Sequence, residues 1–328
     1  YATLLARNEA QQQRAEAIRA RDDAEGLIEF MLTDLRQKLD AVGRLDALEV
    51  VGQRALRYYG AQDIDGLAAD ALGRRARTQL LIGEVDNLRG DLDAALRAYR
   101  QAAATTDEQL SRDPDNPQRL FDHAQSVFWV GYIAWQRGDL DDATRAMAEY
   151  RDHAQRLIAL EPENPDWRVE LGYAVSSLGT IEFEQRQWSI ALDDFQRSRA
   201  INETNVAGKP DDAARLDLGQ DYSYIGETLA VLGRYAEASA SFEGEIALYD
   251  AILAAEATHS LAAARRQWAE IFLARIDLDL GRPAAARPRL ERLENDLLER
   301  VALDTGDTRL RERLHHAVGA HRDHGVPR

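Results

Sequence analysis

Residues 131–166, with the sequence GYIAWQRGDLDDATRAMAEYRDHAQRLIALEPENPD, contain the pattern that decides the fold. Its markers are Gly131, Gly138, Asp139, Leu140, Ala143 and Met147, followed by a proline-rich closing segment. Equivalent patterns, with some markers replaced, surround Gly83, Gly179 and Gly226. Along the chain these four glycines are separated by 48, 48 and 47 residues. A fixed period of this length indicates an array of structural repeats.

Each repeat is predicted to contain two helices that fold back on each other. In the quoted repeat, the first helix is expected over residues 118–137 and the second over residues 141–160. Gly138 is suited to the left-handed backbone that ends the first helix, and Asp139 is suited to capping the second. The prolines of the closing segment prevent the second helix from continuing. So short a connection predicts an antiparallel helical hairpin.

A small residue in the first helix, a Gly-Asp turn, and an alanine followed four residues later by a large apolar residue together resemble the tetratricopeptide repeat (TPR). The resemblance covers most of the chain and implies an all-α fold, a right-handed superhelical solenoid of antiparallel helical hairpins. The period departs from the usual 34 residues of that family. We expect the excess to lengthen each helix by about seven residues, or two turns, to ~30 Å.

The repeat pattern divides the chain into four parts. Residues 1–25 are dense in charge, which predicts a charged helical extension or linker. Residues 26–60 are predicted to form a degenerate N-terminal capping hairpin, since a solenoid needs an atypical terminal unit. Within residues 61–303, repeats are expected at about 67–112, 118–161, 166–209, 213–256 and 262–303. Residues 304–328 are predicted to form a C-terminal capping helix and a tail.

The composition excludes several classes of function. A formal net charge of −16 provides no basic surplus, so we expect neither nucleic-acid binding nor binding to anionic membranes. The absence of cysteine excludes disulfides and thiol chemistry. No apolar run reaches the ~18 residues of a membrane helix, so direct membrane insertion of this segment is not expected. A cytoplasmic location is favoured, with tethering through sequence upstream of Tyr1 as the alternative.

The sequence contains none of the common catalytic motifs: no P-loop, no GxGxxG after a strand, no HExxH and no GxSxG. Acidic pairs such as Asp141-Asp142 lie near predicted helix starts, where carboxylates stabilise the helix dipole. We therefore predict that the protein is not an enzyme and uses no cofactor and no metal. A metal site among four C-terminal histidines is the alternative to a solvated terminal helix, which is preferred. These histidines are His315, His316, His321 and His324.

The resemblance also implies where a ligand binds, because TPR arrays present the first helix of each hairpin on their concave side. Counted from the glycine of that helix, concave positions fall one and four residues after it and three and six before it. The predicted groove residues are Arg77, Leu80, Glu84, Asn87, Gln125, Phe128, Tyr132, Trp135, Tyr173 and Phe183.

The predicted groove is rich in aromatic residues and poor in basic ones. Its five aromatic members form a cluster of the kind that anchors bound proteins. The alternative is that the long helices bury these rings against neighbouring hairpins. Arg77 is the single basic residue among the concave positions, against two acidic ones. We therefore expect the ligand to be a neutral-to-basic apolar segment of a protein or peptide, or another domain of the same polypeptide.

A helical repeat array without catalytic motifs predicts a scaffold for protein–protein interaction. Within that class we favour the regulatory or sensor part of a larger bacterial signalling protein, next to a kinase, nucleotide-cyclase or STAND-type ATPase module. This narrower expectation rests on a loose similarity of organisation. The alternatives are a stand-alone adaptor or chaperone-like protein, and a solenoid that forms homo-oligomers through exposed apolar helix faces.

Overall fold

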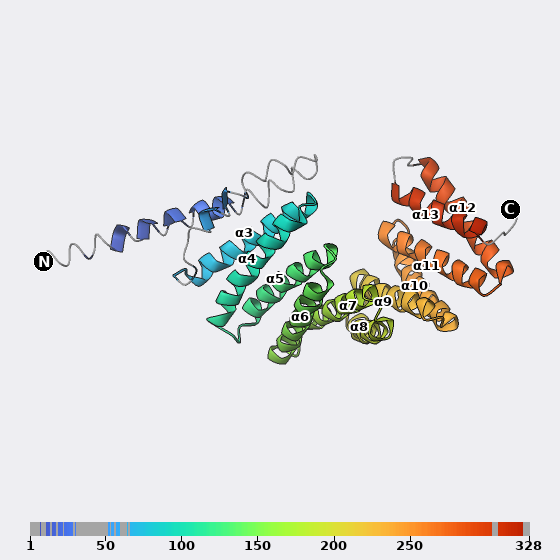
Figure 1. The fold of residues 1–328 in the computed structure, drawn as a ribbon, viewed down its shortest axis with the longest axis horizontal. Coiled ribbons are helices and arrows are strands. Elements are labelled where there is room, and N and C mark those ends of the chain that lie inside the picture. The colour runs from blue at the N-terminus through green and yellow to red at the C-terminus, as the bar shows by residue number, and fades with distance from the viewer. Residues whose placement is uncertain are drawn as a thin grey trace. The chain divides into compact units, whose positions relative to one another are not determined.

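The structure is a computed structural model, which describes residues 66–303 and 308–323, residue 64, and scattered positions between residues 7 and 59. Every regular element of this described part is a helix, as Figure 1 shows. The predicted all-α fold is therefore confirmed. None of the described helices combines the length and the apolar character needed to cross a bilayer.

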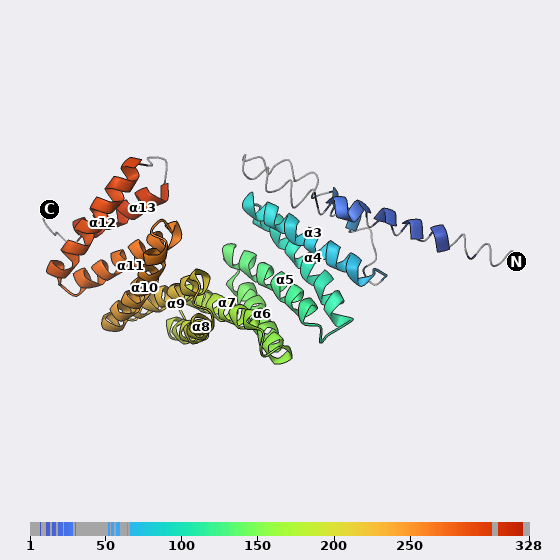
Figure 2. The same cartoon turned by 180° about the vertical axis from the view of Figure 1, so that it is seen from behind.

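The helices follow one another as antiparallel pairs, which Figure 2 shows from behind. The pairs are α3 (Ala69–Leu88) with α4 (Leu92–Ser111), α5 (Pro117–Gln136) with α6 (Leu140–Leu160), α7 (Pro165–Glu184) with α8 (Trp188–Gly208), α9 (Asp212–Val231) with α10 (Tyr235–Ala255), and α11 (Ser260–Asp279) with α12 (Pro283–Leu303). A further helix, α13 (Thr308–Asp323), packs against α11 and α12. The paired helices contain 20 or 21 residues each, so they are ~30 Å long and the predicted lengthening is confirmed.

A residue with left-handed backbone ends the first helix of each pair. Gly90, Gly138, Gly233 and Gly281 occupy this position, with φ between 68° and 79°. The equivalent residue between α7 and α8 is Arg186, whose φ is 61°. The predicted role of Gly138 is confirmed, and the third repeat makes the same turn without its glycine.

The two aspartates that follow Gly90 and Gly138 make different contacts. Asp91 accepts a hydrogen bond from the Ala94 backbone N–H at 2.9 Å and so caps α4. Asp139 holds the same position before α6, but its side chain makes no capping hydrogen bond. Instead its carboxylate pairs with Arg137 at 3.1 Å, and Arg137 also pairs with Asp93 of α4 at 2.6 Å. The prediction that Asp139 caps α6 is wrong, because a guanidinium competes for its oxygens.

The repeated glycine in the first helix allows the two helices of a pair to approach closely. A Cβ added at Gly83 would lie 2.7 Å from the Tyr99 ring, and one added at Gly226 would lie 2.8 Å from the Phe242 ring. The other two pairs are Gly131 with Met147 at 3.0 Å and Gly179 with Phe195 at 2.8 Å. At Gly83, Gly179 and Gly226 contacts this short leave no room for a side chain, whereas at Gly131 the neighbouring side chains would have to move slightly. The predicted packing role of the repeated glycine is confirmed.

In three of the four pairs the large side chain that covers the glycine is an aromatic ring, and this ring also contacts the next pair. Tyr99 of α4 stacks on Trp129 of α5, with ring centroids 5.4 Å apart and an interplanar angle of 11°. Phe242 of α10 stacks on Phe272 of α11 at 5.2 Å and 6°. One ring thus fills the space beside its own glycine and joins its hairpin to the following one, as stacking of repeats requires.

The chain forms two compact units, residues 1–167 and 168–328. Each has its own buried clusters, with Tyr99 and Ile133 in the first unit and Phe195 and Phe242 in the second. The division falls within the first turn of α7, which begins at Pro165. The right-handed superhelix expected from the resemblance stays a prediction.

Much of the predicted N-terminal cap lies outside the described residues, as do residues 304–307 and 324–328 of the predicted C-terminal part. The described positions before residue 25 are mainly exposed, whereas Glu25 is buried. Its carboxylate accepts a hydrogen bond from Nε of Arg74 at 2.7 Å. The charged extension therefore contacts α3 at this residue.

Candidate functional site

The predicted groove residues of the first unit lie on α3 and α5. Helix α5 begins at Pro117. Proline has no backbone N–H, but in the first turn of a helix that group would have no intrahelical acceptor, so no hydrogen bond is lost. Asn116 caps the helix by accepting a backbone N–H at 3.2 Å. From this start, Phe128, Tyr132 and Trp135 follow at spacings of four and three residues, so they share one face of α5.

These three rings form a continuous row. The centroids of Phe128 and Tyr132 are 6.1 Å apart in a stacked arrangement, and those of Tyr132 and Trp135 are 5.7 Å apart. Phe128 also packs on Tyr150 of α6 at 5.4 Å. All three side chains of the row are half-buried. The rings are thus neither fully exposed nor fully buried: each is held by neighbouring rings and keeps accessible surface.

Trp129 belongs to this surface although sequence reasoning missed it. It makes edge-to-face contacts with Phe128 at 5.3 Å and with Tyr132 at 5.5 Å, and it stacks on Tyr99. A positional signal for it exists, because Trp129 precedes the glycine of its helix by two residues, as Tyr224 does in α9. Phe128, Trp129, Tyr132 and Trp135 together are named the α5 aromatic surface.

The other predicted residues of the first unit lie beside this surface. Leu80 of α3 and Tyr132 pack against the same buried cluster, which brings the two helices together. Arg77 is exposed, and Leu80, Glu84, Asn87 and Gln125 are half-buried. Burial raises the pKa of the Asp122 carboxyl on α5, and the Gln118 hydrogen bond and the nearby Arg77 charge oppose that shift. Arg77 is thus accompanied by the carboxyls of Glu84 and Asp122, so these positions carry no surplus of basic residues.

The remaining two predicted groove residues, Tyr173 and Phe183, lie on α7 in the second unit. Tyr173 is 44% exposed, and its hydroxyl donates a hydrogen bond to Asp217 of α9 at 3.0 Å. Burial and the Asp217 charge raise the pKa of this hydroxyl, so it stays a neutral donor. Phe183 is half-buried against the cluster that contains Phe195 and Phe242. Tyr173 is the accessible member of the two, whereas Phe183 contributes mainly to packing.

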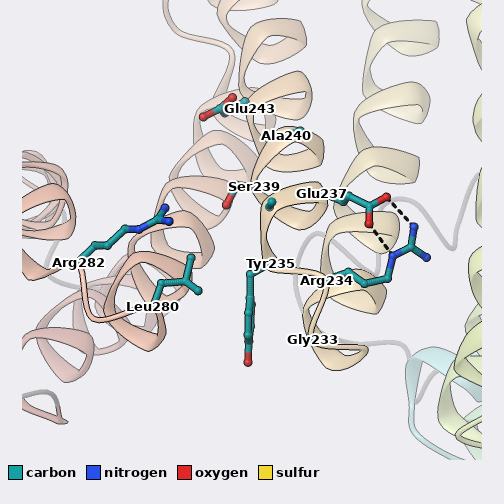
Figure 3. Close-up of a pocket in the computed structure, with 10 residues that line it drawn as sticks. Gly233, Arg234, Tyr235, Glu237, Ser239, Ala240, Glu243, Leu280 and Arg282 are labelled. Carbon is teal, nitrogen blue, oxygen red and sulfur yellow. Dashed lines mark hydrogen bonds and ion pairs between the residues drawn. The ribbon is translucent and has the colours of Figure 1, made fainter.

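A pocket of about 550 Å³ in the second unit was not predicted. It is lined by Gly233, Arg234, Tyr235, Ala236, Glu237, Ser239, Ala240, Glu243, Leu280 and Arg282. Figure 3 shows Arg234 turned toward Glu237, with two contacts of 2.6 and 2.7 Å between guanidinium and carboxylate. This pairing cancels one positive charge of the pocket lining.

Three potential metal ligands meet between α5 and α6. The Nε2 atoms of His123 and His153 lie 3.7 Å and 3.6 Å from the same oxygen, Oε1 of Glu149. These three residues, which sequence reasoning did not single out, are named the His-Glu-His cluster.

Asp212, Glu256 and His259 of the second unit also lie within reach of one ion. Two of them are already engaged, because Asp212 pairs with Arg215 at 3.2 Å and His259 caps α11 through Nδ1. Of the C-terminal histidines, His316 accepts a hydrogen bond from Arg275 at 3.2 Å and packs on Trp268. The His321 side chain and His324 lie outside the described residues.

No protein-family model and no curated protein matches this sequence. Solved structures do match. BtubC (BKLC) from P. vanneervenii aligns with a TM-score of 0.58 and 13% identity over 80% of this chain and 91% of its own. The apo form of RapI aligns at 0.50 and 15% identity over 76% and 83% of the two chains. A putative kinesin light chain from Podosopora anserina with TPR-like repeats aligns at 0.50 and 16% identity, over 67% and 94%. Identities this low show the fold, and the chain has the fold of a TPR-like solenoid.

Proposed function

We propose that this protein is a scaffold for protein–protein interaction and that the α5 aromatic surface is part of its binding site. The supporting observation is the arrangement of four rings on one helix, each in contact with at least one other. Rings fixed in this way lose little conformational freedom on binding and offer a large apolar area. Interface residues that dominate binding energy are commonly of this type.

The proposed ligand is a neutral-to-basic apolar segment. The chain has 57 acidic against 41 basic residues, so long-range attraction favours a basic partner. Arg77 is the one basic residue among the predicted groove residues beside the α5 aromatic surface. It is accompanied by the carboxyls of Glu84 and Asp122. An acidic segment would meet repulsion there without a compensating cluster of Lys and Arg.

A pair of peptides tests this ligand chemistry. Both would present the same Leu and Phe residues on one helical face, with Lys on the opposite face of one peptide and Glu on that of the other. We expect the Lys peptide to bind at least ~10-fold more tightly at low salt, with a difference that shrinks as salt is added. Fluorescence of the aromatic surface tryptophans reports binding. Tighter binding of the Glu peptide would refute the proposed ligand class.

Substitutions on α5 test the location of the site. Tyr132→Ala and Trp135→Ala are each expected to weaken the Lys peptide by ~10- to 30-fold, the loss typical of residues that dominate an interface. Arg145→Ala on α6 is the control, because that side chain is 72% exposed and lies outside the aromatic surface. Circular dichroism would verify that every variant keeps its helices. Unchanged affinity in both aromatic variants would place the site elsewhere.

A regulatory or sensor role within a larger bacterial signalling protein is the narrower form of this proposal. What supports it is the similarity in organisation between a charged helical segment followed by repeats and the repeat regions of such proteins. The mass of the native protein is the test. A mass near 36.8 kDa would contradict the narrower form and favour a stand-alone adaptor.

A further inference from the structure

We propose that His123, Glu149 and His153 form a binding site for one divalent transition-metal ion of the Zn²⁺ class. His123 lies on α5, and Glu149 and His153 are four residues apart on α6, one turn from each other. The antiparallel packing of this hairpin brings the ligand atoms together within 4.8 Å of one another. The proposal does not depend on the proposed scaffold function.

Two of the three separations between ligand atoms are close to those of tetrahedral coordination. Zinc binds imidazole nitrogen and carboxylate oxygen at about 2.0–2.2 Å, so two ligand atoms at tetrahedral angles are separated by roughly 3.3–3.5 Å. Oε1 of Glu149 lies 3.7 Å from Nε2 of His123 and 3.6 Å from Nε2 of His153. Shifts of a few tenths of an ångström bring these two separations to zinc geometry, and the third, between the two imidazoles, is at most 4.8 Å. Two imidazoles and one carboxylate are a ligand set that zinc uses in proteins.

Thr106 of α4 sets the tautomer of His123. Its hydroxyl lies 3.1 Å and 3.0 Å from the Ala102 and Ala103 carbonyls and 3.0 Å from Nδ1 of His123. A hydroxyl has one proton to donate. Since the carbonyls can only accept it, the hydroxyl accepts the Nδ1–H of neutral His123. The lone pair of Nε2 then points toward Glu149, which is the arrangement that second-shell hydrogen bonds give to metal-binding histidines.

Within the described part of the chain, the Nε2 atoms of both histidines also lack hydrogen bonds to protein groups that would take the place of a metal ion. The His123 ring is almost fully buried, at 5% exposure, and faces a carboxylate oxygen at a distance too long for a hydrogen bond. Nε2 of His153 is shielded from solvent and has no hydrogen-bond partner among the described residues. A cation between these atoms would satisfy all three ligands at once, since two nitrogen lone pairs and a carboxylate converge on it.

The fourth coordination position has room for a further ligand. His123 and Glu149 line a pocket of about 310 Å³ whose walls come from α4, α5 and α6. Water or a donor from a bound partner would complete the tetrahedron from this side. The ion would link α5 directly to α6, and it would link both helices to α4 through the hydrogen bond between Thr106 and His123. Its binding would stabilise the folded first unit increasingly as the zinc concentration exceeds the Kd.

Zinc titration of the protein after removal of metal with a chelator tests the proposal. We expect one Zn²⁺ to bind and to raise the Tm, and Co²⁺ in its place to give the strong visible absorption of a tetrahedral site. Glu149→Gln and His153→Gln should each weaken binding by at least ~100-fold, and the near-isosteric Thr106→Val by ~10- to 100-fold. Asp152→Asn is the control, since it removes an exposed carboxylate next to His153.

Three results would overturn the site. The first is a chain that binds no zinc beyond the level of the double variant Glu149→Gln, His153→Gln. The second is equal affinity in the parent chain and in both single ligand variants. The third is loss of binding in Glu256→Gln, which would place the ion at the group around His259 instead. Peptide binding by the same variants separates this test from that of the scaffold function, because none of them changes the α5 aromatic surface.

Discussion

Arg186 occupies a backbone conformation in which other pairs have glycine. A residue with a Cβ in the left-handed region costs ~1–2 kcal/mol. Replacing Arg186 with glycine relieves this strain. Glycine also increases the conformational entropy of the unfolded chain, which lowers stability by ~0.4–1 kcal/mol and offsets part of the gain. Arg186→Gly is therefore expected to raise the free energy of unfolding by ~0.5–1 kcal/mol, measured by urea titration.

The reverse change provides the control for this prediction. Gly138 has φ +79° and open space where a Cβ would stand, so Gly138→Ala adds backbone strain without a steric clash. We expect it to lower stability by ~1 kcal/mol. If Arg186→Gly also lowers stability, the arginine side chain makes a contact that outweighs its backbone strain.

At Gly226 the limit on substitution is the space for a side chain rather than the backbone conformation, because the Phe242 ring fills the position of a Cβ. Alanine at this position gains ~0.5–1 kcal/mol of helix propensity but places a methyl 2.8 Å from the Phe242 ring. Overpacking of a core costs ~1–3 kcal/mol, so Gly226→Ala should destabilise the protein on balance. Gly208→Ala is the matched control, since nothing lies within 4 Å of a Cβ there. Thermal unfolding distinguishes the two, and equal Tm values would contradict the packing argument.

At the scale of the helix, the α9–α10 hairpin contains buried carboxyls that make its stability depend on pH. Burial raises the pKa of Glu245 to about 8, and the charge of Glu227 adds to the shift. Burial likewise raises the pKa of Asp221 to about 7, although Ser198 and Asn202 donate hydrogen bonds to it at 2.7 Å. Both groups bind a proton more tightly in the folded than in the unfolded state. The contribution of Asp221 to stability therefore falls as pH rises from 3.8 through about 7, and that of Glu245 falls from 4.5 through about 8.

Glu245→Gln tests this dependence because glutamine resembles the protonated carboxyl. The variant should match the parent near pH 4 and exceed its stability by a few kcal/mol near pH 8, since each pKa unit corresponds to about 1.4 kcal/mol. Glu243→Gln, an exposed position on the same helix, should show no such pH-dependent gain. A variant that is less stable than the parent at pH 8 would show that ionised Glu245 is stabilised by its surroundings.

Helices and hairpins were predictable from sequence because their signals are local and periodic. The glycine pattern placed α5 and α6 to within a residue or two, and it anticipated the contact between Gly131 and Met147. Signals that depend on competition between side chains were not predictable. Asp139 has the right type and position for a cap, yet Arg137 takes its oxygens.

The candidate sites were predictable only in part, for a related reason. The α5 aromatic surface follows from helix periodicity, apart from Trp129, whose stacking on Tyr99 depends on the preceding hairpin. In the His-Glu-His cluster, His123 and Glu149 are 26 residues apart on different helices. Their proximity follows from the register between α5 and α6, which a sequence pattern does not specify. The order of repeats was readable, whereas contacts between helices needed the structure.

At the scale of the whole molecule, the division into residues 1–167 and 168–328 predicts that a local perturbation stays within its unit. Repeat arrays gain stability from nearest-neighbour contacts, and regions with separate cores open separately. Gly226→Ala should therefore speed amide hydrogen exchange in α8 to α11 while leaving α3 to α6 unchanged. Helix α7 should follow the second unit, because all but its first residues belong to it. Equal acceleration in α3 to α6 would show instead that α7 couples both units into one cooperative structure, since a continuous helix across the division is the element able to transmit such a change.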